Sequence, residues 1–191
     1  MDLLRIERVY DGFLKMDKLT IKLPALDKPF VREVMVRAPA ACVLVYDPVL
    51  RVVLAIEEFR VGNLAAGLPE DECWSLGPVA GMIEPGSTPA STAKREAVEE
   101  AGFNADDAVF YGPYTTLPSP GGLGEIIHHF VAFGDLSKVA DGSVHGLVSE
   151  NESTTARLID VDEAFAMLNS GKAINGLLAT CLLHLERLLR A

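Results

Sequence analysis

The stretch that most constrains the fold runs from residue 81 to residue 103, because it reads as a loop that leads into a single helix. Thr88 and Pro89 are typical of a helix start, since the hydroxyl can cap the first turn and proline has no backbone N–H to leave unpaired. Gly102 is typical of a helix end, because glycine readily adopts the left-handed conformation found there. The sequence therefore predicts a helix of about three and a half turns between these residues.

The predicted helix has an acidic side and an apolar side. Glu96, Glu99 and Glu100 have the spacing i, i+3 and i+4, which places them on one side of a helix. Three alanines lie along the opposite side: Ala93, Ala97 and Ala101. We expect the alanine side to pack closely, while the acidic side faces a cavity or solvent.

Carboxylates this close repel one another, so positive charge is expected among them. Arg95 can pair with Glu99 at i+4, which leaves Glu96 and Glu100 one turn apart. These two suit a hard divalent cation, Mg²⁺ or Mn²⁺, that prefers oxygen ligands. The alternative is a solvated acidic helix face. The loop in front disfavours that alternative, because its glycines at 81 and 86 allow the backbone to approach a phosphate.

The spacing of these residues resembles the signature of the Nudix hydrolases. The matching positions are Gly81, Arg95, Glu96, Ala97, Glu99, Glu100, Gly102 and Phe103. One position departs from the signature, since its first glutamate is Ser87 here. The segment VAGMIEPG most resembles the ADP-ribose pyrophosphatase branch, and the similarity continues on both sides for most of the chain.

Length and composition limit the class of protein. A chain of 191 residues, 49% of them hydrophobic, is expected to form one domain with a small appendage. The net charge of −10 argues against binding nucleic acid or an anionic membrane. No apolar run approaches about 18 residues, and the N-terminus has no signal-peptide core, so we expect neither a membrane protein nor an exported one.

The cysteines predict the compartment. Cys42, Cys73 and Cys181 are odd in number, widely spaced and without a CxxC pair. We interpret them as buried free thiols in a reducing cytosol, which predicts a cytoplasmic protein.

The chain divides into an N-terminal β-strand region, residues 1–38, and a Nudix hydrolase domain, residues 39–191. The first region alternates apolar and polar residues in three stretches, with Asp11-Gly12 as a turn, which predicts antiparallel strands. Because so small a sheet buries little of its own surface, we expect it to pack against the main domain or a second subunit. The resemblance implies that it helps to form a homodimer.

The remaining residues predict an α/β fold. Two β-rich runs around Asp47-Pro48 read as a hairpin, and residues 63–72 read as a polar loop. Further strands follow the helix, and leucines at helical spacing end the chain in an amphipathic helix that packs on the core. This order indicates a mixed β-sheet in an α/β/α sandwich, the Nudix fold, with a small N-terminal antiparallel β piece.

Two acids in a late loop are further candidates. Glu150 and Glu152 could simply be solvated loop charges. The resemblance favours a functional role, because a Glu-x-Glu follows His-Gly-Leu in the matching loop of ADP-ribose pyrophosphatases, as it follows residues 145–147 here. It implies that Glu150 is the catalytic base and Glu152 a third metal ligand, with the reverse assignment left open. Together with Glu150, we expect Glu99 and Arg95 to be catalytic.

The resemblance also implies a substrate site. In SPGGLGE it implies contacts from Ser119, Pro120, Gly121 and Glu125, although a tight hairpin turn would explain the same letters. The charged candidates are Arg32, Glu33, Arg37 and Arg60. Phe13 and Leu14 match a site that packs on the base, with a core role as the alternative. The Ala80 carbonyl matches a metal contact and the Met82 main chain a substrate contact.

His128-His129 invites a zinc interpretation. Adjacent strand residues point to opposite faces, so the two cannot easily share one ion. We expect one to face the core and the other to be solvated.

The predicted function is metal-dependent hydrolysis of a nucleoside diphosphate sugar, with Mg²⁺ as cofactor and Mn²⁺ possible. ADP-ribose, cleaved to AMP and ribose 5-phosphate, leads, ahead of other ADP-sugars and GDP-mannose. Ser87 and Gly77 stand where many relatives carry acids, which leaves less negative charge near the metals. The alternative is therefore a Nudix-fold protein that binds a nucleotide sugar as a sensor.

Overall fold

The computed structural model describes residues 1–147, 149, 152–172 and 174–191. Its contacts divide the chain into two compact units. The N-terminal unit consists of residues 1–40 with residues 115–127, and the main unit consists of residues 41–114 with residues 128–191. A segment from the middle of the chain thus joins the N-terminal strands.

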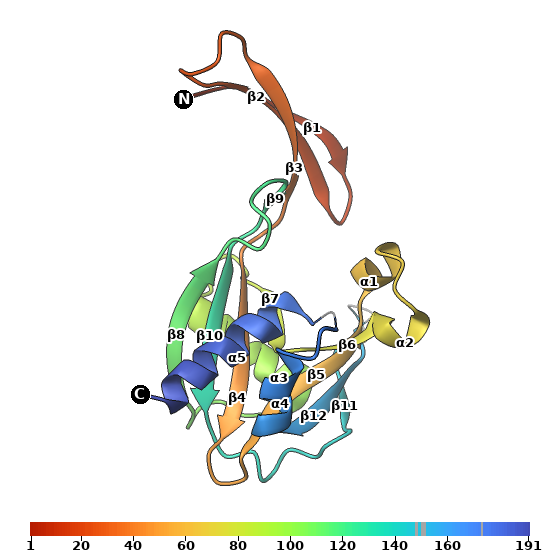
Figure 1. Cartoon of the computed structure of the whole chain (residues 1–191), viewed down its shortest axis with the longest axis vertical. Helices are drawn as coiled ribbons and strands as arrows, with labels where there is room; N and C mark the ends of the chain where they lie inside the picture. Colours follow the sequence, from red (N-terminus) through yellow and green to blue (C-terminus); the bar gives the residue numbers. More distant parts are fainter. Residues whose placement is uncertain (148, 150–151, 173) are drawn as a thin grey trace. The chain divides into compact units, whose positions relative to one another are not determined.

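The N-terminal unit is a four-stranded sheet of order β1-β2-β3-β9 (Figure 1). Its strands are β1 (Asp2–Asp11), β2 (Lys15–Lys22), β3 (Phe30–Val36) and β9 (Leu123–Gly124). The first three pair antiparallel, which confirms the strands predicted from alternation. The short β9 pairs parallel with β3, so the SPGGLGE segment, for which a tight turn was one expectation, also extends this sheet.

The main unit is built on an eight-stranded sheet whose path is β11-β12-β5-β4-β10-β8. The strands on this path are β11 (Val144–His145), β12 (Thr154–Asp160), β5 (Val52–Phe59), β4 (Ala40–Asp47), β10 (Ile127–Phe133) and β8 (Val109–Thr116). Two further strands lie off the path: β6 (Trp74–Gly77) pairs with β5, and β7 (Val79–Met82) pairs with β4. Pro78, which has no N–H for a ladder, separates β6 from β7.

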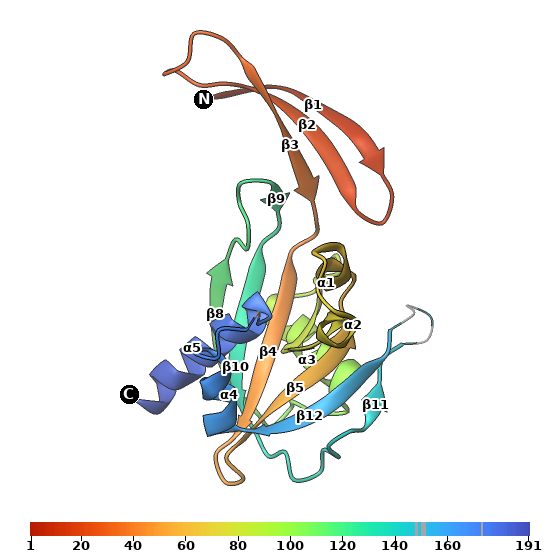
Figure 2. The same ribbon diagram turned by 45° about the vertical axis from the view of Figure 1, so that its right-hand side comes forward.

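Helices cover both faces of this sheet, as an α/β/α sandwich requires. Helix α3 (Pro89–Ala101) packs on one face, and α4 (Val161–Met167) and α5 (Gly176–Leu189) pack on the other (Figures 1 and 2). The predicted fold class is therefore confirmed. Among the described residues, no helix combines the length and the apolar character needed to cross a membrane.

The prediction of a loop over residues 63–72 was wrong in part. Two short helices occupy this region, α1 (Val61–Ala65) and α2 (Glu70–Cys73). Pro69 precedes three acidic residues in the first turn of α2, an arrangement that favours a helix start because negative charge suits the helix N-terminus. The amide of Asn63 donates to the Glu72 carbonyl at 2.9 Å and closes the segment.

Strand β4 is buried on both faces and separates two halves of the core. Ala41, Val43 and Val45 form one cluster with the alanine stripe of α3, and all six side chains are essentially inaccessible. Small alanines let the helix approach the sheet closely, as predicted. The alternate position Cys42 lies on the opposite face, where its sulfur contacts Cys181 of α5.

Candidate functional site

Helix α3 begins and ends where the sequence predicted. The Thr88 hydroxyl accepts a hydrogen bond from the Ser91 N–H, and the Ser91 side chain in turn bonds the Thr88 backbone, which forms a capping box with Pro89 in the first turn. Gly102 ends the helix in the left-handed conformation, with φ of 63°. These two ends fix which side of the helix carries the acids.

Strand β7, which precedes the loop before α3, lies directly against Glu96 and Glu100. A Cβ atom placed on Gly81 would lie 1.7 Å from Glu96 Oε1, so a larger residue here would displace that carboxylate. The backbone N–H of Ala80 donates to Glu100 Oε2 at 2.9 Å. The end of β7 and the helix thus position each other through the two carboxylates.

Both carboxylates are removed from water. Glu96 is 7% and Glu100 is 4% exposed, so the acidic side of the helix is more buried than a cavity wall or solvated face would be. Burial raises the pKa of Glu96 to about 7, against the lowering effect of Arg95. Burial raises the pKa of Glu100 to about 8, against the Ala80 hydrogen bond. The protein therefore holds these groups where a full negative charge is unfavourable.

Arg95 is shared by two acids. Its Nη1 donates to Glu99 Oε2 at 2.5 Å, which confirms the predicted pair, and its Nη2 donates to Glu96 Oε1 at 2.6 Å. The second bond was not predicted, because neighbours in a helix sequence do not usually face each other. The long guanidinium reaches back across the helix surface to bridge them.

Sequence reasoning missed Glu58. This half-buried residue lies two positions after the buried part of β5, and its charge raises the pKa of Glu100. Burial raises the pKa of Glu58 as well, while Arg60, with Nη2 at 2.8 Å from Glu58 Oε2, lowers it. The signal was an acid following an otherwise apolar core strand, which needs a partner or a role.

The late loop comes to the C-terminal end of α3. The Gly146 N–H donates to the Glu99 carbonyl at 3.0 Å, and the Thr154 hydroxyl donates to the Glu100 carbonyl at 2.8 Å. The charge of Glu152 raises the pKa of both Glu96 and Glu100, so this acid lies near them. Glu150, the other acid predicted in this loop, lies outside the described residues.

We name Glu58, Glu96, Glu99, Glu100 and Glu152 the carboxylate cluster. Arg60 pairs with Glu58, and Arg95 pairs with Glu96 and Glu99, while burial still raises the pKa of Glu96 and Glu100. Oxygen donors with excess negative charge suit a hard divalent cation, and a cation would replace the missing positive charge. The residues present therefore fit such an ion.

Ser87 and Gly77, which stand where many relatives carry acids, have different surroundings. Ser87 lies in the exposed turn before α3, where its N–H donates to the Glu84 carbonyl at 3.0 Å. Gly77 is buried, and a Cβ there would lie 3.2 Å from Asn175 Nδ2 and 3.3 Å from Arg60 Nη2. An acidic side chain at position 77 would therefore lie next to the Asn175 amide and the Arg60 guanidinium.

The N-terminal unit brings several predicted substrate residues together. Arg37 Nε lies 3.3 Å from Glu125 Oε1, and Glu125 is only 6% exposed. The Ser119 carbonyl accepts from the N–H groups of residues 122 and 123, so Ser119, Pro120 and Gly121 form an exposed turn. Both readings of SPGGLGE, a turn and a binding segment, remain compatible with this arrangement.

The other predicted substrate residues are more exposed. Arg32 stacks over the Phe30 ring at 4.7 Å, and Glu33 lies 3.5 Å from Lys18 Nζ. Phe13 is 85% exposed, so its alternative core role is wrong. Leu14 is half-buried, and Met82, in the main unit, is exposed.

The histidines and cysteines partly follow the sequence prediction. His129 is buried, as expected for one member of the pair, whereas His128 is half-buried rather than solvated. Cys42, Cys73 and Cys181 are all buried and free, as predicted.

Comparisons with known proteins place the chain among relatives along nearly its whole length. The family model described as NUDIX domain matches residues 36–177. The ADP-ribose pyrophosphatase of Haemophilus influenzae is 30% identical over 183 residues, which covers 93% of this chain and 82% of that protein. The GDP-mannose pyrophosphatase of Yersinia enterocolitica is 30% identical over 177 residues, covering 91% and 88%. A crystal structure titled an ADP compounds hydrolase superposes with a TM-score of 0.73 at 21% identity, covering 99% of this chain and 94% of that one.

Proposed function

The chain belongs to the Nudix family, and we propose that it hydrolyses the diphosphate of a nucleoside diphosphate sugar, with ADP-ribose as the leading substrate. Members of this family in general use a divalent metal ion. The observation that carries the proposal is the buried pair Glu96 and Glu100, held under Gly81 with too little positive charge around them.

The ion we propose is Mg²⁺, with Mn²⁺ as the other candidate. Its ligands in this proposal are Glu96, Glu100 and Glu152, with the carbonyl oxygen of Ala80. When bound, such an ion supplies the positive charge that neutralises the oxygens of a diphosphate. Glu58 is a further candidate, because its carboxylate acts on Glu100 from β5.

In this proposal, other residues hold the carboxylates in position and activate the attacking water. Arg95 holds the Glu96 and Glu99 carboxylates in place through its two hydrogen bonds. Glu150 takes the proton of the attacking water in this proposal, and Glu152 is the alternative base. A base on this loop is supported by the bonds that join the loop to the end of α3.

The substrate is proposed from the relatives and from the N-terminal unit. The relatives' names include both ADP-ribose and GDP-mannose pyrophosphatase, which keeps GDP-mannose as the second substrate to test. The proposed substrate contacts are Phe13, Leu14, Arg32, Glu33, Arg37, Arg60, Met82, Ser119, Pro120, Gly121 and Glu125. Guanidinium groups suit phosphate oxygens because their donors form a planar fork.

We also propose a cytoplasmic homodimer. Every residue of β1 is exposed, including Leu3, Ile6 and Tyr10. A strand with so much exposed apolar surface suits an interface with a second copy. Free buried thiols suit a reducing compartment.

The direct test is release of AMP and ribose 5-phosphate from ADP-ribose, measured with Mg²⁺, with Mn²⁺ and with chelator. A panel of other ADP-sugars and GDP-mannose ranks the substrates. We expect turnover with a divalent ion and none with chelator. Measurable binding without turnover of any of these compounds would contradict hydrolysis and support the sensor, which the departures at Ser87 and Gly77 favour.

A further inference from the structure

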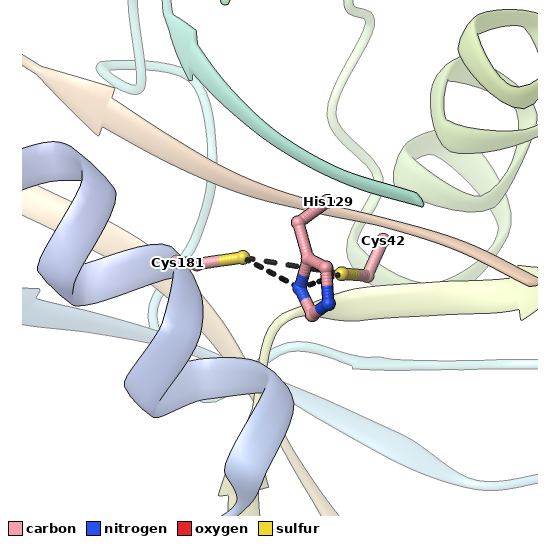
Figure 3. A group of neighbouring side chains, drawn as sticks. All are labelled: Cys42, His129 and Cys181. Atoms are coloured by element: carbon pink, nitrogen blue, oxygen red, sulfur yellow. Dashed lines mark hydrogen bonds between the residues drawn. The ribbon is translucent and has the colours of Figure 1, made fainter. Parts of the chain in front are cut away.

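The face of the main sheet opposite α3 holds a second polar cluster, which the proposed hydrolysis does not use. Cys42 of β4, His129 of β10 and Cys181 of α5 point toward one another there (Figure 3). Their exposed fractions are 0%, 1% and 0%. We name these three residues the thiol–imidazole cluster.

The ligand atoms of this cluster are close. Among the described residues, no other group of three or more Cys, His, Asp or Glu side chains brings its ligand atoms within 4.8 Å of one another. The two sulfurs are 3.9 Å apart, and His129 Nδ1 lies 3.2 Å from Cys42 Sγ and 3.8 Å from Cys181 Sγ. Side chains from three separate elements thus meet at one point.

These separations are close to the edges of a zinc coordination tetrahedron, and the edge from Cys42 Sγ to His129 Nδ1 is the one that must lengthen. With Zn–S bonds of about 2.3 Å and Zn–N bonds of about 2.0–2.1 Å, tetrahedral sulfurs lie about 3.8 Å apart and each lies about 3.6 Å from the nitrogen. A triangle with the observed edges has a point about 2.1 Å from all three atoms, within the range of these bonds. Little rearrangement is needed for one ion to contact all three.

We propose that Cys42, His129 and Cys181 bind one Zn²⁺ ion inside the protein. Sulfur and imidazole nitrogen are the donors that zinc prefers, whereas Mg²⁺ prefers oxygen. Two thiolates and a neutral imidazole around Zn²⁺ carry no net charge, which suits a site without solvent contact. Cu⁺ with the same ligands would leave a buried negative charge.

The fourth position of this site has a nearby oxygen. The Phe130 carbonyl lies 3.7 Å from Cys181 Sγ, next to His129 on β10. Either this oxygen or one enclosed water completes the tetrahedron. Because the three side chains are inaccessible, the ion is structural and has no open position for substrate.

The ion would tie α5 to the sheet. Cys42 and Cys181 are 139 residues apart in sequence, and His129 lies 52 residues before Cys181. A bond between such distant segments stabilises the folded state, because the unfolded chain does not hold the ligands together. Zinc removal should therefore loosen the packing of α5 and leave the Mg²⁺-dependent chemistry on the other face in place.

The test uses the full chain, reduced and free of metal, loaded with Zn²⁺ and dialysed against a weak chelator. We expect about one Zn²⁺ per chain by elemental analysis, and loss of that ion in Cys181→Ser. Cys73→Ser is the matched control, since Cys73 is also buried and free but lies outside the cluster. Glu100→Gln should keep its zinc even if it hydrolyses nothing, which separates this proposal from the proposed function.

A second measurement needs no variant. X-ray absorption at the zinc edge of the loaded wild type should give two sulfur neighbours at about 2.3 Å and a nitrogen neighbour at about 2.0–2.1 Å. A first shell without sulfur, or no zinc above the level held by Cys181→Ser, would overturn the proposal. Retention of Cu⁺ but not Zn²⁺ under the same conditions would also overturn it.

Discussion

The two faces of the main sheet carry buried polar clusters of opposite chemical character. The carboxylate cluster on the α3 face offers oxygen and has too little positive charge, and burial raises the pKa of Glu96 and Glu100. The thiol–imidazole cluster on the α5 face offers sulfur and nitrogen, and its ligand atoms lie within 4.8 Å of one another. Among the described residues, no three members of the carboxylate cluster each bring an oxygen within that distance of the others.

The supporting elements differ in the same way. Strand β7 borders the carboxylate cluster at Gly81, just before the loop that leads to α3, and the loop that contains Gly146 borders it on the other side. Two strands and a helix supply all of the thiol–imidazole cluster. A site bordered by loops can admit and release a ligand, whereas a site closed by regular elements suits a permanent ion. The difference indicates that one sheet can separate turnover from structural support.

The largest effect is expected from Glu100→Gln. The amide keeps the size of the side chain but removes a charged oxygen from the proposed ligand set, so kcat should fall on the order of 100-fold or more. AMP release at saturating Mg²⁺ measures this. Glu186→Gln on α5 is the matched control and should keep wild-type activity, since Glu186 pairs with Arg190 on the opposite face of the sheet. Equal activity of both variants would remove Glu100 from the site.

Gly81→Ala should have the next largest effect. The added methyl would overlap Glu96 Oε1, which lies 1.7 Å from its position, and would push that carboxylate aside. The Mg²⁺ concentration for half-maximal activity should rise about 10–100-fold. Gly62→Ala, where nothing lies within 4 Å of the new Cβ, serves as the control. An unchanged Mg²⁺ requirement would mean that Glu96 does not bind the ion from this position.

The pH dependence of stability should differ between the faces. The ordinary carboxyl pKa of 4.5 rises to about 7 for Glu96 and about 8 for Glu100 in the folded chain. Protonation of these two groups therefore stabilises the folded chain. This contribution is fully present below about pH 4.5 and is lost as the pH rises through 7 and 8. Without divalent ions, the melting temperature of the wild type, relative to that of a Glu96→Gln, Glu100→Gln double variant, should fall as the pH rises from about 4.5 to about 8. A constant difference would contradict the raised values, and Mg²⁺ should restore stability mainly above pH 7.

The smallest effect is expected from Ser87→Glu. Ser87 is exposed, so an acid there adds attraction for the ion through solvent and should lower the required Mg²⁺ only a few-fold. The Mg²⁺ titration of AMP release measures this change. A gain as large as the loss in Gly81→Ala would show that the carboxylate cluster is incomplete without the missing acid.

Local patterns predicted much of this molecule. The ends of α3 follow from Thr88, Pro89 and Gly102, and its buried stripe follows from the spacing of three alanines. The N-terminal strands follow from alternation. These features depend on neighbours in the sequence, and the physical rules for such neighbours are strong.

Long-range register could not be predicted from the residues. Glu58 joins the carboxylate cluster only because β5 ends beside the α3 acids. Cys42 meets Cys181 across 139 residues through the alignment of β4 and α5. The alternation of adjacent histidines in a strand does not reveal the cysteines that approach His129 from other elements. The pairing of β9 with β3 likewise joins segments that are far apart in the sequence.

Gly102 shows how a residue without a side chain can anchor a loop. Its left-handed backbone, with φ of 63°, ends α3, and the His145 ring fills the space where a Cβ would lie, with Cε1 at 2.7 Å from that position. Helix termination and docking of the loop that carries Glu152 are therefore a single packing event. We therefore expect residues 102 and 145 to change together in evolution. A single replacement at 102 would disturb both the left-handed helix end and the packing of the His145 ring.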